Sequence, residues 1–314
     1  MYYPIHAKAW PVDIENYFDG GVPASFYAFL YKSLNPYGQA KLTIKLSIKF
    51  RPLQPKAIPF QQDANGRPFW TSPWSDADWR KFIQAVTAQA NLWNNKFWLL
   101  PPPLFSDLDV VWQSMAVPGW GNFAGQAFRP NLRCELQVDL NPLGEADHTI
   151  DVANIDMAVL LGRAAGRVMT AGTFRSHSLL YDSLDAVPWA FPLGPGPDNP
   201  RVHPVIAHEI GHSIGLGHIG TLVKSPLCDF AIAADQLGIG AGDFRGGRNA
   251  FVCYGGHQGR MTENIMGAGD VFTTQNAKPW IWAIGSRNGL NRGFESALWR
   301  AVMQDPGPGS WVRH

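Results

Sequence analysis

The run His208-Glu209-Ile210-Gly211-His212-Ser213-Ile214-Gly215-Leu216-Gly217-His218 decides how the rest of the chain is interpreted. Side chains four residues apart lie on one face of a helix, so His208 and His212 can converge on a single ion. Glu209 is then placed to reach a water at the open coordination position. Gly215 can leave the helix with a positive φ, and that turn would bring His218 to the same ion as third ligand. The run therefore predicts a zinc site with three histidine ligands.

Residues 208–218 resemble the zinc-binding signature of the metzincin clan of zinc peptidases, and the run from Ala207 is similar in particular to the matrixin wording. The clan also carries a methionine turn beneath the metal. Met266, in Glu263-Asn264-Ile265-Met266-Gly267, is the natural candidate for it. The resemblance implies that Met266 forms a floor under the imidazoles without binding the metal. The resemblance to the clan rests on matching motif residues over 204–267. Elsewhere only the expected order of helices and strands agrees with it.

Three departures leave the branch of the clan open. Ile219 follows the third histidine, where many matrixins have Ser, and Ala268 stands where other branches carry a Tyr that reaches the zinc. A propeptide switch of the Pro-Arg-Cys-Gly type is also missing, since Cys134 lies in Arg133-Cys134-Glu135-Leu136.

The resemblance implies an α+β fold in a single catalytic domain over residues 1–314. We expect an upper subdomain over 41–218, with a twisted, mostly parallel sheet packed on two long helices, the second being the zinc helix. A small, loop-rich lower subdomain over 219–314 would hold the Met turn and end in a helix. Residues 1–40 are an N-terminal extension of unclear role.

Periodic patterns place several elements along the chain. Residues 41–50 alternate without a break and predict a half-buried strand, with Leu42, Ile44, Leu46, Ile48 and Phe50 facing inward. Ser75 is the expected cap of a helix whose apolar stripe runs to Phe97. Residues 133–140 predict a second strand, and further strands are expected near 108–116 and 166–181. Asn291 is the expected cap of a final helix through Val302.

Composition and charge exclude several partners. Lys and Arg number 26 against 25 Asp and Glu, so the net charge of +1 offers no footprint for nucleic acid or an anionic membrane. No stretch approaches the roughly 20 apolar residues of a membrane span. We expect a monomer that acts on a protein or peptide. The N-terminus lacks the features of a secretory signal, so the protein stays in the cell, leaves by a route without a leader, or is a processed chain.

Two further histidines and three cysteines could also bind a metal or form a disulfide. His203 and His257 are expected at the surface or beside the ligands, because the three-ligand set is already full. The sequence does not indicate a structural Ca²⁺. Cys228 and Cys253 could close a loop in an oxidising compartment and leave Cys134 as a buried thiol, and three reduced cysteines are the equal alternative.

The expected chemistry is hydrolysis of internal peptide bonds. Three neutral imidazoles leave zinc its full charge, which acidifies a bound water, and Glu209 would take the proton and pass it to the leaving amine. One alternative directs the same chemistry at peptide cross-links of cell walls, with Trp74 or Trp120 stacking on sugars. The other is a non-catalytic binding protein in which zinc staples loops.

Overall fold

A computed structural model of the chain shows a mixed α+β fold. The structure describes residues 6–14, 24–32, 40–55, 61–62, 68–69, 71–103, 108–111, 126–155, 180–192, 200–217, 264–267, 269–286 and 298–312. The statements below concern those residues. None of the helices in them has both the length and the apolar character needed to cross a membrane.

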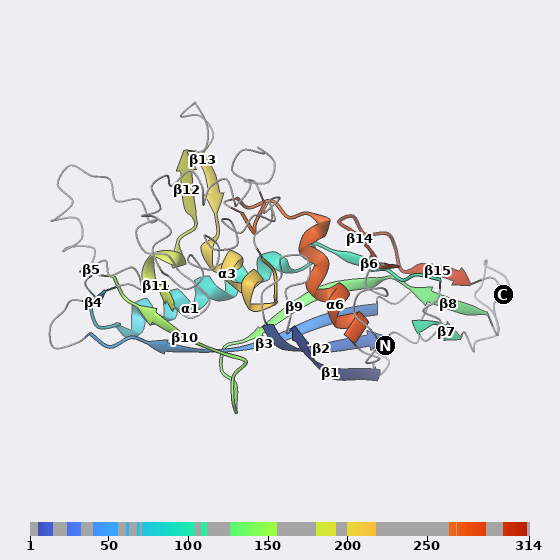
Figure 1. Cartoon of the computed structure of the whole chain (residues 1–314), viewed down its shortest axis with the longest axis horizontal. Coiled ribbons are helices and arrows are strands. Elements are labelled where there is room, and N and C mark those ends of the chain that lie inside the picture. Colours follow the sequence, from blue (N-terminus) through green and yellow to red (C-terminus); the bar gives the residue numbers. More distant parts are fainter. Residues whose placement is uncertain are drawn as a thin grey trace, which may run out of the picture.

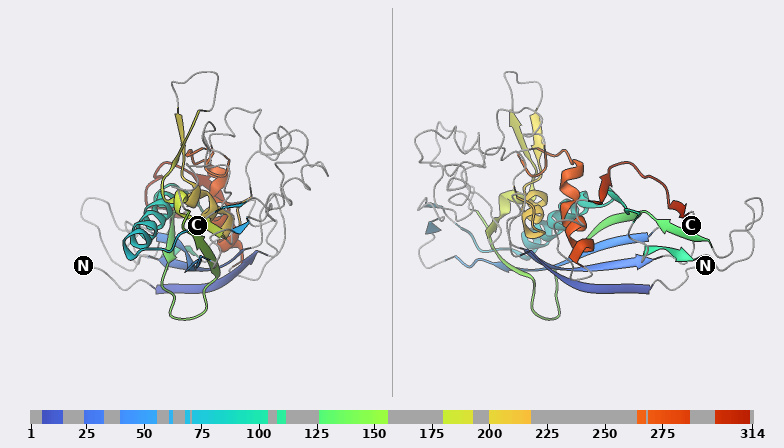
Figure 2. Two further views of the ribbon diagram at one scale, coloured as in Figure 1. Left: turned by 90° about the vertical axis from the view of Figure 1, so that its left-hand side faces the viewer. Right: turned by 45° about the vertical axis from the view of Figure 1, so that its right-hand side comes forward.

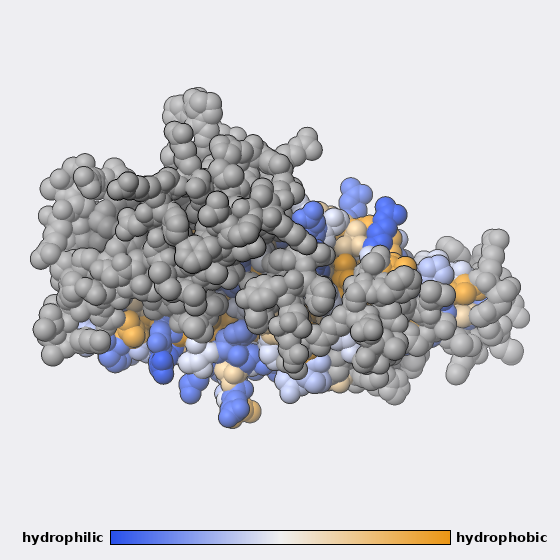
Figure 3. Space-filling model, viewed as in Figure 1, coloured by the Kyte–Doolittle hydropathy of each residue, from blue (hydrophilic) through white to orange (hydrophobic). Residues whose placement is uncertain are grey.

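The long strand β3 (Ala40–Pro52) lies at the centre of an eight-stranded sheet. Its predicted alternation is confirmed, because Leu42, Ile44, Leu46 and Ile48 are buried and Phe50 is half-buried. Hydrophilic side chains predominate on the described surface along the strand-rich lower side of the molecule in Figure 3. The alternation thus sorts apolar side chains to the core and polar ones to the other face.

Strands on both sides of β3 make the sheet mixed. Parallel pairs join β3 with β9 (Leu132–Asp139), β3 with β10 (His148–Ala153), and β10 with β11 (Leu180–Asp182). The pairs of β9 with β6 (Trp98–Leu100) and of β6 with β14 (Arg300–Val302) are antiparallel, as are those of the first three strands. The expectation of a mostly parallel sheet is therefore wrong.

Much of the segment that was expected to be an N-terminal extension belongs to this sheet. β1 (His6–Ile14) pairs antiparallel with β2 (Ala24–Lys32), and β2 pairs antiparallel with β3. Phe26, Ala28 and Leu30 of β2 are buried in the main core. Strands that follow each other through short connections pair antiparallel, which explains these two pairs, whereas β6 pairs antiparallel with strands that are not its neighbours in the sequence.

Two helices of unequal length lie on one side of the sheet. α1 (Asp76–Ala90) begins at Ser75, whose hydroxyl accepts a hydrogen bond from Asp78 N at 3.1 Å, as the sequence predicts. It continues as the 3₁₀ turn η1 (Asn91–Trp93), and Asn95, with φ 58°, then turns the chain before Phe97. α3 (Val205–Ser213) packs against α1 and has only nine residues, so one of the two expected long helices is short (Figure 2).

The chain ends in strands rather than in a helix. Helical conformation ends at Leu298, while β14 (Arg300–Val302) pairs with β6 and β15 (Gly309–Val312) pairs with β8 (Ala127–Pro130). The predicted helix is wrong at Val302, and its expected cap Asn291 lies outside the described residues. Val302 lies instead in β14, opposite Trp98 of β6, because pairing with the edge of the sheet replaces the last turn of the predicted helix.

Smaller elements complete the described fold. A hairpin of β12 (Trp189–Pro192) and β13 (Pro200–His203) projects away from the sheet and leads directly into α3 (Figure 1). The 3₁₀ turn η5 (Thr274–Ala277) and helix α6 (Lys278–Ser286) follow the Met266 segment. The short strands β4, β5 and β7 and the turn η4 cover Gln61–Gln62, Pro68–Phe69, Val110–Val111 and Ser183–Ala186.

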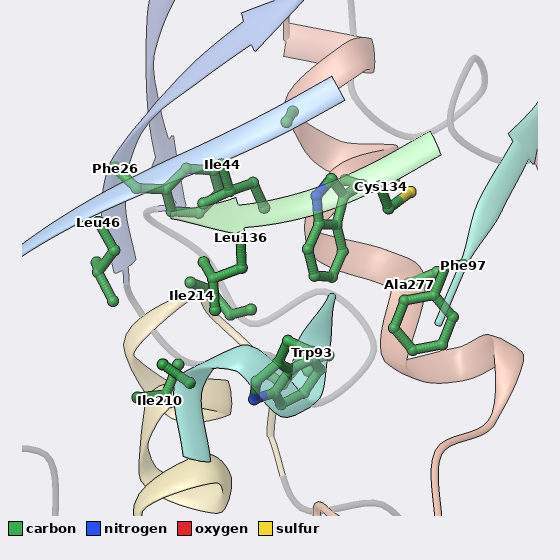
Figure 4. Close-up of a cluster of buried hydrophobic side chains, with 14 of the residues drawn as sticks. Phe26, Ile44, Leu46, Trp93, Phe97, Cys134, Leu136, Ile210, Ile214 and Ala277 are labelled. Carbon is green, nitrogen blue, oxygen red and sulfur yellow. The ribbon is translucent and has the colours of Figure 1, made fainter. Parts of the chain in front are cut away.

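One hydrophobic cluster joins the sheet, α1, α3 and α6. Ile210 of α3 and Ile214, the residue that follows the helix, lie in the same cluster as Trp93 and Leu136 (Figure 4). Cys134 belongs to it as a buried free thiol, as predicted, whereas Cys228 and Cys253 lie outside the described residues. Burial raises the pKa of the Cys134 thiol well above its usual value. α3 is therefore anchored in the main core of the protein.

Candidate metal centre

His208 and His212 face each other on α3. Their Nε2 atoms are 3.1 Å apart, and their rings meet edge to face with centroids 4.7 Å apart. Two nitrogens bound to one tetrahedral zinc at about 2.0–2.1 Å would lie about 3.3 Å from each other. The spacing of the two imidazoles thus fits a shared zinc ion.

Backbone carbonyls fix the tautomers of both rings. His208 Nδ1 lies 2.7 Å from Ile265 O, and His212 Nδ1 lies 2.7 Å from Leu216 O. A carbonyl oxygen only accepts, so each Nδ1 carries the hydrogen and donates it. Burial lowers the pKa of His212 to about 4, although the bond to Leu216 O opposes this. When both rings are neutral, these tautomers direct the two Nε2 lone pairs at each other, an arrangement that a cation between them stabilises.

Glu209 follows His208 on α3 and lies in a buried, acidic setting. Only 6% of the residue is exposed. Burial raises the pKa of its carboxyl well above the usual value, and the charge of Asp185 raises it further. A carboxyl that holds its proton more readily suits a group that must first accept and later return a proton.

The exit from α3 follows the prediction for Gly215. This glycine has φ 96°, in the region that residues with a Cβ rarely adopt. Gly215 N donates to His212 O and Leu216 N donates to Gly211 O, both at 2.9 Å, which closes the last turn of the helix. The same turn brings Leu216 O to His212.

Met266, the residue that the clan resemblance singles out for a methionine turn, lies directly against α3. Met266 is fully buried, and a Cβ at Gly211 would overlap its sulfur and come within 3.0 Å of Trp93 Cζ2. Only a residue without a side chain lets α3 approach the Met266 turn this closely.

Paired amides hold that turn. The side chains of Asn264 and Asn276 exchange two hydrogen bonds of 3.0 and 3.1 Å, and Asn264 Oδ1 also accepts from Met266 N at 2.8 Å. Both residues are almost completely buried. The turn that presents Ile265 O to His208 is therefore built on a satisfied polar pair.

Of the other residues that the sequence singled out near the site, the structure describes only some. His203 is buried, its ring centroid lies 5.1 Å from that of His208, and its Nδ1 lies 3.1 Å from Gly269 O. Within the described part of the chain, no three His, Cys, Asp or Glu side chains group as a metal site. His218, the third predicted ligand, lies outside that part, as do His257, Ile219, Ala268 and Trp120.

Trp74 is half-buried rather than presented to solvent. Its indole donates to Val152 O at 3.1 Å, and its ring packs on Trp79 and Phe82 with centroids 5.2 and 5.6 Å away. The residue therefore belongs to the packing of α1 on the sheet.

Sequence reasoning missed the residues that support this centre from α1, η1 and η4. Gln89, Trp93 and Asp185 are buried next to α3 or Glu209. A signal for Gln89 was present, because it is a polar residue on the buried stripe of Phe82, Val86 and Trp93. Asp185 has no comparable signal, since its place depends on the tertiary fold.

Comparisons of the chain with protein-family models, with curated proteins and with solved structures found no match. The candidate centre therefore stands on its own residues: two facing imidazoles, a buried carboxyl, a glycine exit and a methionine turn.

Proposed function

We propose that the protein is a zinc-dependent endopeptidase related to the metzincins. One observation carries the proposal: the Nε2 atoms of His208 and His212 converge at 3.1 Å, while both Nδ1 atoms donate to backbone carbonyls. A pair oriented in this way on a buried helix is typical of metal ligands. Glu209 follows the first of them directly in the sequence.

The histidines would hold zinc, with His218 as the proposed third ligand. Zinc held by three imidazoles acts as a Lewis acid that polarises a carbonyl and makes a water more acidic. The bonds to Ile265 O and Leu216 O keep each ring in the tautomer whose Nε2 can bind metal. Met266 and Gly211 keep α3 against the turn that supplies Ile265 O.

Glu209 would move the proton. A carboxylate oxygen of Glu209 accepts a proton from the attacking water and later donates it to the nitrogen of the leaving amine. Its burial keeps bulk water from competing for that proton, and Asp185 favours the protonated form after the first transfer. The proposed substrate is an extended segment of a protein, as in the clan that the sequence resembles.

The test compares zinc content and hydrolysis in Glu209→Gln and in wild type. The variant keeps the size of the side chain but cannot take a proton, so we expect full zinc content and a loss of roughly 10²- to 10⁴-fold in casein hydrolysis. Glu145→Gln, an exposed change on the loop before β10, is the control and should match wild type. A chelator should abolish wild-type activity, and zinc should restore it.

Three other results would contradict the proposal or favour one of the alternative functions. Activity that survives Glu209→Gln would exclude Glu209 as the base. A wild-type protein that binds zinc but cuts no peptide would favour the zinc-stapled binding protein. Cleavage of cell-wall fragments without cleavage of casein would select the cell-wall peptidase.

A further inference from the structure

The start of α3 is capped by a side chain from another helix. Pro204 is the N-cap residue and its side chain makes no capping hydrogen bond. The first amides of a helix have no partners within it. Gln89 Oε1, on α1, accepts from Ile206 N at 3.0 Å and lies 3.4 Å from Ala207 N. The amide oxygen of Gln89 thus takes the role of a cap.

The same side chain also binds η4. Gln89 Nε2 donates to Asp185 O at 2.9 Å, so one amide joins α1, η4 and α3. Only 5% of Gln89 is exposed. A buried amide in an apolar stripe costs free energy unless its hydrogen bonds are made, and here both ends of the amide are used.

Trp93 binds α3 at Ala207. Its indole Nε1 donates to Ala207 O at 3.0 Å, and its ring is fully buried against Gly211. Ala207 is therefore held at its amide by Gln89 and at its carbonyl by Trp93. The residue that follows is His208.

We propose that Gln89 is a positioning residue of the metal centre, which sets the start of α3 so that His208 meets His212. The inference rests on the proposed function and deepens it. His212 takes its carbonyl partner from its own turn, whereas His208 takes Ile265 O from a distant segment. A shift at the start of α3 would therefore disturb the bond of His208 to Ile265 O, and with it the orientation of that ring, while His212 keeps its bond to Leu216 O.

The experiment measures metal binding in Gln89→Met, which keeps the length of the side chain and removes all three hydrogen bonds. Zn²⁺ affinity is measured by competition with a chromophoric chelator, and the visible spectrum of the Co²⁺-loaded protein reports ligand geometry. We expect Zn²⁺ binding to weaken by about 10- to 100-fold, the usual effect of losing a group that orients a metal ligand. The Co²⁺ bands should shift or lose intensity.

Phe82→Leu is the matched control. Phe82 is buried in the same helix but packs on Phe50, Trp74 and Trp79, so the change lowers stability without removing a hydrogen bond to α3. It should leave the Zn²⁺ affinity and the Co²⁺ spectrum as in wild type. Should Gln89→Met fail to fold, Gln89→Asn takes its place, because it keeps an amide that is one methylene too short to join Asp185 to α3.

The outcomes separate the two proposals. Wild-type affinity and an unchanged Co²⁺ spectrum in the Gln89 variant would overturn the positioning role and leave the proposed function standing. Weakening of equal size in Phe82→Leu would also overturn it, because general destabilisation would then explain the loss. A wild-type protein that binds neither Zn²⁺ nor Co²⁺ would overturn the proposed function itself, and this inference with it.

Discussion

The two ends of α3 are held in different ways. Its first turn is bound by Gln89 and Trp93, which lie more than a hundred residues earlier in the chain. Its last turn is closed by its own residues, through the bonds of Gly215 and Leu216 to the helix. The two histidines follow the same division, since His208 bonds to distant Ile265 O and His212 to nearby Leu216 O. A short motif thus encodes the end of the helix, and the rest of the fold positions its start.

The largest expected effect comes from removing the distant support of His208. Asn264→Ala deprives Met266 N and the amide of Asn276 of buried partners. Because each buried group left without a partner costs about 1–3 kcal/mol, we expect the free energy of unfolding to fall by roughly 2–4 kcal/mol. Zn²⁺ affinity should fall as well, since Ile265 O moves. Urea denaturation and chelator competition measure the two quantities.

Asn131→Ala is the control for that change. Its amide donates to Gly307 O at 3.0 Å, away from α3, and the residue is half-buried. It should cost about 1 kcal/mol of stability and leave Zn²⁺ binding as in wild type. Unchanged Zn²⁺ affinity in Asn264→Ala would show that His208 does not depend on the Met266 turn.

A smaller effect is expected from Trp93→Phe, which removes the indole donor to Ala207 O and leaves a small cavity. We expect a loss of about 2 kcal/mol in the free energy of unfolding, together with weaker Zn²⁺ binding. Trp280→Phe is matched to it, because Trp280 is equally buried and donates to Glu135 O at 2.9 Å on β9. The two variants should lose similar stability, and only Trp93→Phe should lose Zn²⁺ affinity. Equal Zn²⁺ binding in both would remove Trp93 from the support of α3.

The same division explains how much the sequence could predict. The strand at β3, the cap at Ser75 and the exit at Gly215 depend on spacing and on local backbone chemistry, and the structure confirms all three. Met266, which only the clan resemblance singled out, contacts α3 at Gly211, whereas its role under a metal stays a prediction. The strand, the cap and the helix exit could be predicted because each is determined within a few residues.

Features that depend on distant contacts were missed or mistaken. The N-terminal strands, the antiparallel pairs of the sheet and the pairing of β14 with β6 need partners that no periodic pattern identifies. Gln89 showed a signal, a polar residue on a buried stripe, but its partner on α3 could not be inferred from it. The proposed zinc ligands and Glu209 lie within eleven consecutive residues, whereas the contacts that hold α3 come from across the chain.

The smallest expected effect tests the local end of α3. Gly215→Ala places a Cβ on a residue with φ 96°, which should cost about 1–2 kcal/mol in the free energy of unfolding. Gly285→Ala is a control with the opposite expected sign. Gly285 lies within α6 and no atom is near its added Cβ, so the free energy of unfolding should rise by about 0.5–1 kcal/mol. Chemical denaturation of both variants measures the difference.

A double variant then sharpens the comparison between the two ends. Ile206 and Gly215 are nine residues apart, about 13 Å along a helix, so Gln89→Met and Gly215→Ala alter separate sets of contacts. Their effects on the free energy of unfolding should add to within about 0.5 kcal/mol if the start and the end of α3 are held independently. A larger deviation would mean that the distant contacts and the local turn stabilise one another, and the motif would then depend on α1 even for its own exit from the helix.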